Sequence, residues 1–144
     1  MVRVMRAGGA APTVFDLSKQ SVGELNKFLH GDLKDIKAVR VENPDGAHSI
    51  AVAVDAPLRI EIGGNVGYFG AGLSKQATVI IEGNAGPGVA ENMMSGRVEV
   101  TGFASGGAGA SAHGGLLVIH GDAGLRCGIS LKGADIVVGG DVGS

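Results

Sequence analysis

The 144-residue chain has few of the residues that commonly supply cross-links, metal ligands or ring stacking. A single cysteine, Cys127, excludes an internal disulfide framework and a CxxC zinc site. Aromatic residues make up 3% of the chain, and its four prolines come without a glycine at every third position, which excludes collagen. No apolar run approaches about 20 residues, so we expect no membrane span, and the N-terminus lacks the apolar core of a signal peptide.

An excess of one charge sign is also missing. The formal net charge is −2, which argues against a general surface for nucleic acids or anionic membranes. Apolar residues nevertheless reach 44%, rich in Val, Ile and Leu, so the chain can bury a core and is not a disordered glycine-rich linker. We expect a cytoplasmic protein.

Glycine is abundant and unevenly placed. Residues 1–57 contain five glycines and residues 58–144 contain the other 22. Five of these glycines recur at a constant spacing of 19 residues: Gly64, Gly83, Gly102, Gly121 and Gly140. Such a fixed period is the signature of a repeat architecture.

The columns around these glycines agree from unit to unit. Apolar residues lie four and two positions before each glycine, a small residue lies two positions after it, and another glycine usually follows at the third position: Gly67, Gly86, Gly124 and Gly143. An Asn or Asp follows the first glycine in four of the five units, and the third unit deviates with Phe103 and Ser105. Each unit therefore predicts a short strand with one buried face, followed by a tight turn.

A period of 19 residues suits one coil of a parallel β-helix, in which each unit stacks on the one before at about 4.8 Å. It is too short for helical repeats, which need 33 or more residues. It also differs from the 18-residue coil of hexapeptide helices, and GGxGxD nonamers are absent. We predict about five coils over residues 58–144. The last unit is incomplete, so either the chain is shortened or another chain covers that end.

The first 57 residues follow a different pattern, and we predict a small α/β cap there. Ser21 and Glu24 form a capping-box signature for a short helix over residues 22–30, with Gly31 just after its end. Residues 13–17, 36–41 and 50–54 alternate apolar side chains and are predicted as strands, with a connecting turn over residues 42–48.

Catalytic candidates are few. His120 occupies an outward column of the repeat and is expected to be a solvated surface residue, whereas His113 lies in a Gly/Ala/Ser loop. Cys127 has no histidine in an obvious position to activate it, so a small core cysteine is the favoured interpretation. None of the glycine clusters completes a phosphate-binding motif, and we interpret Gly64, Gly67, Gly83, Gly86, Gly102, Gly121, Gly124 and Gly140 as structural corners. We assign no catalytic, cofactor or metal residue.

Two segments are unusual enough to predict an interface. Met93 and Met94 are adjacent and cannot both face a narrow core, so one packs under a bend or both contribute to a partner surface. Tyr68 and Phe69 are adjacent aromatics in a loop of a chain that has few. The predicted interface set is Tyr68, Phe69, Glu91, Asn92, Met93 and Met94.

Several segments carry a family resemblance: GGNVGYFGAGLSK, GVAENMMSG, SAHGGLLVIHGDAGLRCGISLKG and DIVVGGDVG, together with FDLSKQSVGELNKFLH near the start. They resemble the stand-alone GXGXG β-helix subunits of the glutamate synthase family, and are most similar to the small subunit of N-methylglutamate synthase (methylamine–glutamate N-methyltransferase). The resemblance implies a right-handed parallel β-helix. It also implies a non-catalytic structural subunit that holds a glutamine-amidotransferase-like subunit and an FMN and iron–sulfur synthase subunit in register. This chain would then hold no cofactor itself.

Two alternatives remain open at this stage. Related coils occur in the β-helix subunit of formylmethanofuran dehydrogenase, a molybdenum or tungsten enzyme. An independent β-helix transferase with its site between protomers is the other, and His113 is its only plausible catalytic residue.

Overall fold

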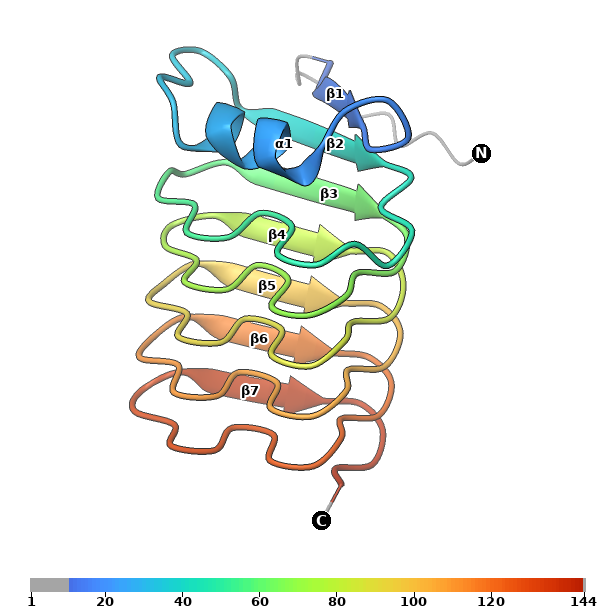
Figure 1. The fold of residues 1–144 in the computed structure, drawn as a ribbon. Coiled ribbons are helices and arrows are strands. Elements are labelled where there is room, and N and C mark those ends of the chain that lie inside the picture. The colour runs from blue at the N-terminus through green and yellow to red at the C-terminus, as the bar shows by residue number, and fades with distance from the viewer. Residues whose placement is uncertain (1–10, 144) are drawn as a thin grey trace.

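The chain winds into a single stack of parallel strands. In the computed structural model, which describes residues 11–143, seven strands form one sheet in chain order (Figure 1). The strands are β1 (Thr13–Asp16), β2 (Ala38–Glu42), β3 (Arg59–Gly63), β4 (Thr78–Ile81), β5 (Arg97–Val100), β6 (Leu116–Ile119) and β7 (Asp135–Val138). A short helix, α1 (Val22–Leu29), lies at the β1–β2 end. The predicted parallel solenoid with 19-residue coils and a short helix near the N-terminus is confirmed.

Register follows the sequence columns. Ile60 pairs with Val79, Val79 with Val98, and Val98 with Leu117, each 19 residues further along. These side chains point inward and are fully buried, as are those of the column two residues later. Period-2 alternation thus places one face of every strand in a continuous core.

The predicted corners follow the strands. Val66, Ala85, Ala104 and Ala123 are buried and form a ladder of single parallel bridges. Here the coils stack backbone against backbone: a Cβ added at Gly121 would lie 2.8 Å from the carbonyl oxygen of Gly102. Small residues and glycine are required at this corner because the coil above occupies the space of a side chain.

An Asn ladder joins the coils at the same corner. The Asn65 Oδ1 accepts from the N–H of Asn84 at 2.8 Å, and the Asn84 Oδ1 accepts from the N–H of Phe103 at 2.9 Å. Asp122 does the same for Asp141 at 2.8 Å. Phe103 has no acceptor to offer Asp122, so the deviant third unit interrupts the ladder.

In the rest of each coil, every second residue has a left-handed backbone conformation. In the β3 coil (residues 59–77) these are Phe69, Ala71 and Leu73, with φ of 61°, 53° and 56°. Their N–H groups bond to neighbouring coils in both directions: Phe69 donates to Pro87 below, and Ala71 donates to Ile50 above. We call these stretches the turn arms, and Figure 1 shows them stacked in front of the strands.

The strand predicted over residues 50–54 is wrong. Ala51 and Ala53 have φ of 57° and 58°, and the segment is the first turn arm rather than a strand. Its alternating pattern still buries Ile50 and Val54, because alternating left-handed turns also send successive side chains to different sides. The strand predicted over residues 36–41 forms two residues later, since the Ile36 N–H closes a turn onto Leu33.

The helix caps the first turn arm. The predicted capping box is present, with the Glu24 N–H donating to the Ser21 hydroxyl at 3.0 Å, and Leu25 and Leu29 are buried. Asn26 Oδ1 accepts from the Ala51 N–H, and His30 Nε2 donates to the Val52 carbonyl at 2.6 Å. In later coils the preceding coil's backbone makes these two bonds. The predicted boundary at residue 57, between an N-terminal cap and the coils, stays a prediction. Residues 1–10 of the predicted cap and residue 144 of the last coil lie outside the described residues.

Candidate interaction surface

The structure separates the predicted interface residues into surface and core. Tyr68 and Met94 are 58% and 44% exposed, whereas Phe69, Glu91 and Asn92 are half-buried. Met93 is fully buried, so its place in the predicted interface is wrong. Neighbouring residues of a coil point to opposite sides, and Met93 fills the interior column while Met94 faces solvent.

Tyr68 has a partner that the sequence did not suggest. Its ring stacks on that of His48, with centroids 4.5 Å apart and an interplanar angle of 14°. The Tyr68 N–H donates to His48 Nδ1 at 2.8 Å, which leaves the proton of the neutral imidazole on Nε2. The signal was present, because His48 occupies the place of Tyr68 in the coil before, where the spacing is 20 residues instead of 19.

The other titratable candidates are dispersed. His120 faces outward as predicted, with Nε2 3.2 Å from Glu99 Oε1. His113 is exposed, and no hydrogen bond or ion pair of its side chain occurs within residues 11–143. Cys127 is half-buried against the core, and burial raises the pKa of its thiol, which disfavours the nucleophilic thiolate. Among the described residues no group of three or more His, Cys, Asp or Glu could hold a metal ion.

Arginine and glutamate side chains on the outer face of the sheet form ion pairs with one another. Arg40 contacts Glu42 at 2.9 Å and reaches across Gly63 to Glu82 at 2.8 Å. Further along the stack Glu99 pairs with Arg97, and its pKa is lowered by the hydrogen bond from His120 and then by Arg97. Guanidinium and carboxylate groups therefore satisfy each other here and leave little charge for a ligand.

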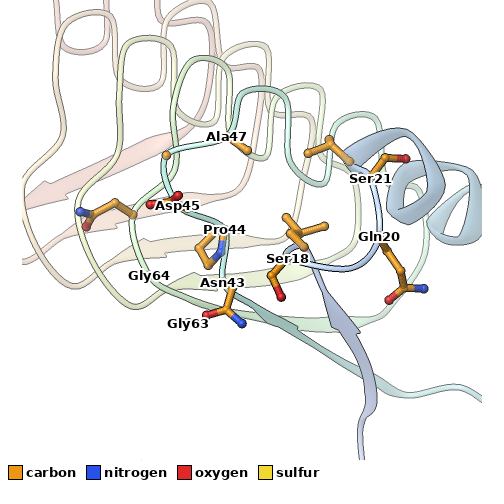
Figure 2. A pocket seen from close by; sticks show the side chains of 13 residues that line it. Ser18, Gln20, Ser21, Asn43, Pro44, Asp45, Ala47, Gly63 and Gly64 are labelled. Atoms are coloured by element: carbon orange, nitrogen blue, oxygen red, sulfur yellow. The ribbon is translucent and has the colours of Figure 1, made fainter.

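A polar groove of about 1020 Å³ lies between the loop before α1 and the corner after β2 (Figure 2). Ser18, Gln20, Ser21 and Asn43 line it with hydroxyl and amide groups. Its lining contains no His, Cys, Lys or Arg, so it has no imidazole base, no thiol and no cation for an anionic ligand. Asp16 beside it is already satisfied: hydrogen bonds from Ser18 and Asn43 lower its pKa to about 2.

A second groove, of about 640 Å³, crosses the turn arms. The arm of the β5 coil (residues 97–115) forms its floor, and the arms of the coils before and after form its walls. Its lining residues are Pro87, Gly88, Glu91, Gly106, Gly107, Ala110, Leu125, Arg126 and Ile129. Only Glu91 of these belongs to the predicted interface. Sequence reasoning missed the rest because it interpreted the glycines as corners and did not compare the outward residues of successive arms.

The solenoid and its surfaces can be compared with known proteins. The chain is 49% identical over 85 residues to Protein GlxC of Rhizobium meliloti (strain 1021), a match that covers 58% of this chain and 37% of GlxC. The chain therefore matches well under half the length of that relative. No protein-family profile matches the chain, and no solved structure matches it. The parallel solenoid is consistent with the GXGXG domain of glutamate synthases.

Residues 11–143 contain no helix of the length and apolarity that crossing a membrane requires. The only helix in this range has eight residues.

Proposed function

We propose that this chain is a non-catalytic structural subunit of a glutamate synthase-like complex, most specifically of an N-methylglutamate synthase. It would hold an amidotransferase-like subunit and an FMN and iron–sulfur synthase subunit in register in the cytoplasm. Both cofactors would belong to partner chains. The observation that carries the proposal is the GlxC-like stack of in-register coils.

The physical properties of the stack support this role. Every coil is hydrogen-bonded to the next at the strands, the corner and the turn arm, so the molecule is a stiff spacer. Two active sites that exchange an unstable or diffusible intermediate need fixed positions, because misplacing reacting groups is costly. A spacer also needs side faces that bind partners, and the exposed apolar residues of the turn arms offer such a face.

The scattered titratable groups favour a scaffold over an independent transferase. His113 and Cys127 lie on the turn arms of successive coils, whereas His120 lies at the end of β6 on the outer sheet face, and within residues 11–143 no hydrogen bond or ion pair joins any two of them. Nucleophilic or acid–base catalysis needs a nucleophile and a base within hydrogen-bond reach. A site shared between two copies would have to be built around His113 alone.

The test is affinity capture of the tagged protein from its own host at modest salt, with mass spectrometry and an absorbance spectrum of the eluate. We expect an amidotransferase-like chain and a yellow-brown flavin and iron–sulfur chain. Molybdenum or tungsten in the eluate would instead indicate the formylmethanofuran dehydrogenase type. A colourless, homogeneous protein would overturn the proposal, and a His113→Ala variant would then be the first test of an activity of its own.

A further inference from the structure

The groove on the turn arms is a fixed feature of the backbone. The Gly88 N–H donates to Gly106 at 3.0 Å and the Gly107 N–H donates to Leu125 at 2.8 Å, so floor and walls belong to one bonded layer. The floor is low at Gly106, which has no side chain where the coil before has Pro87 and the coil after has Leu125. At the next position only the coil after has a side chain, Arg126, because the coil before has Gly88. Figure 1 shows the three arms stacked in order.

The side chains of the lower wall are largely exposed. Leu125 and Ile129 are 57% and 48% exposed, although they are large and apolar. Arg126 is exposed and has φ of 62°, at a place where the two coils before have the unstrained choice, Gly88 and Gly107. Within residues 11–143 neither Arg126 nor Glu91 of the upper wall forms an ion pair.

We propose that this groove is the docking site for an extended segment of a partner chain that carries a carboxylate side chain next to an apolar one. The inference rests on the proposed function, since the partner is a catalytic subunit of that complex. The carboxylate pairs with Arg126, and the apolar side chain lies on the glycine floor against Leu125 and Ile129. Glu91 is the one acidic residue of the lining, and it lies on the upper wall, across the glycine floor from Arg126, with no ion pair between the two.

The dimensions select an extended chain. The two walls are two coil spacings apart, or about 10 Å between backbones. A helix with its side chains is about 10–12 Å across and cannot enter between wall side chains, whereas a single extended chain can. A second copy of this protein does not fit either, because a symmetric dimer would place one concave surface on another and leave it unfilled.

Two variants test the site without disturbing the fold. Arg126→Glu reverses the unpaired charge. Gly106→Leu fills the floor, and its backbone tolerates a side chain, because an added Cβ meets only the Leu125 carbonyl oxygen at 3.4 Å. The matched controls are Lys34→Glu, another exposed cation with a left-handed φ (45°), and Thr101→Leu, a small exposed residue at the end of the sheet face.

The measurement is the affinity of each purified variant for the amidotransferase-like and flavin subunits of the host, with circular dichroism and a melting curve for each variant. We expect both groove variants to melt like the wild type and to lose at least about tenfold in affinity for one subunit. Both controls should bind normally. Added salt should weaken the wild type more than Arg126→Glu.

The outcomes separate the two proposals. If the wild type binds a subunit and both groove variants bind it equally well, the docking site is wrong and the scaffold role stands. If the wild type binds neither subunit, the proposed function fails and the docking inference fails with it. If the wild type forms a dimer that Gly106→Leu abolishes, a second copy is the occupant and the inference is overturned.

Discussion

At the scale of single residues, the repeat works because each coil presents a few atoms at fixed places to the next. The Asn ladder is the clearest case, since the side-chain oxygen of one coil accepts the backbone N–H of the following coil at 2.8–2.9 Å. The period of the sequence predicts this column, and its one exception, Phe103, is 52% exposed and breaks the ladder.

Phe103→Asn should stabilise the protein. Asn at this position supplies the missing acceptor for the Asp122 N–H and removes an exposed ring, for a gain of about 0.5–1.5 kcal/mol in the free energy of unfolding. Chemical denaturation measures the difference. Phe103→Ala is the control, because it removes the ring without supplying an acceptor, and an equal gain in both variants would refute the ladder explanation.

Asp16 makes a pH-dependent contribution. Hydrogen bonds from Ser18 and then Asn43 lower its pKa from 3.8 to about 2, so its stabilisation is present above about pH 4 and is lost as the pH falls towards 2. Asp16→Ala should therefore melt at a lower temperature than the wild type at pH 7. The gap should close between pH 4 and pH 2 in parallel melting curves, and a gap that stays constant would contradict the assignment.

At the scale of elements, α1 supplies the hydrogen-bond partners that a preceding coil supplies to each later turn arm. Where later arms bond to backbone above them, the first arm bonds to the side chains of Asn26 and His30. The capping box predicts the helix from sequence, but its role depends on side-chain contacts about 25 residues apart. No local pattern contains that information.

Asn26→Ala should lower the free energy of unfolding by about 1–2 kcal/mol, because it leaves the Ala51 N–H and the Ser49 carbonyl without their partner. Lys27→Ala is the neighbouring control on the exposed side of the helix and should change stability little. Denaturant titrations of both variants decide the matter. Equal stability of the two variants would mean that α1 covers the first turn arm but that its hydrogen bonds to the arm add no stability.

The corner element gives a second comparison. Gly121→Ala places a Cβ 2.8 Å from the Gly102 carbonyl oxygen and should cost about 1–3 kcal/mol, because the coils must separate. Gly106→Ala meets nothing closer than 3.4 Å and should stay within about 0.5 kcal/mol of the wild type. Thermal melting of the two variants measures the contrast, and a similar loss in both would show that the corner is not closely stacked.

At the scale of the whole molecule, the unbroken pairing of strands from β1 to β7 makes a rigid body with distinct faces. The outer sheet face is paired by its own Arg and Glu residues, whereas the turn arms expose Leu73, Met94, Leu125 and Ile129. If the chain is the scaffold proposed above, we expect its partners to bind on the turn arms and to leave its interior unchanged.

Hydrogen–deuterium exchange tests this rigidity in the assembled complex. We expect slower exchange of the amides over residues 125–129 when the partner is bound, and unchanged exchange in β3, β4 and β5. The reason is that strands already bonded on both sides gain nothing from a partner on another face. Altered exchange throughout the strands would contradict a passive scaffold and indicate a conformational response.

The sequence by itself determined the solenoid, its 19-residue coil, the buried columns and the capping box, because periodicity and turn chemistry act over short distances. Tertiary structure alone decided the rest. Residues 50–54 have the alternation of a strand but form a turn arm, since their backbone partners are the arm of the next coil. Which of Met93 and Met94 faces the core followed from where the arm of that coil lies, and Tyr68 was paired with His48 by stacking between coils. The groove likewise exists only where the glycines of one coil lie between the side chains of two others.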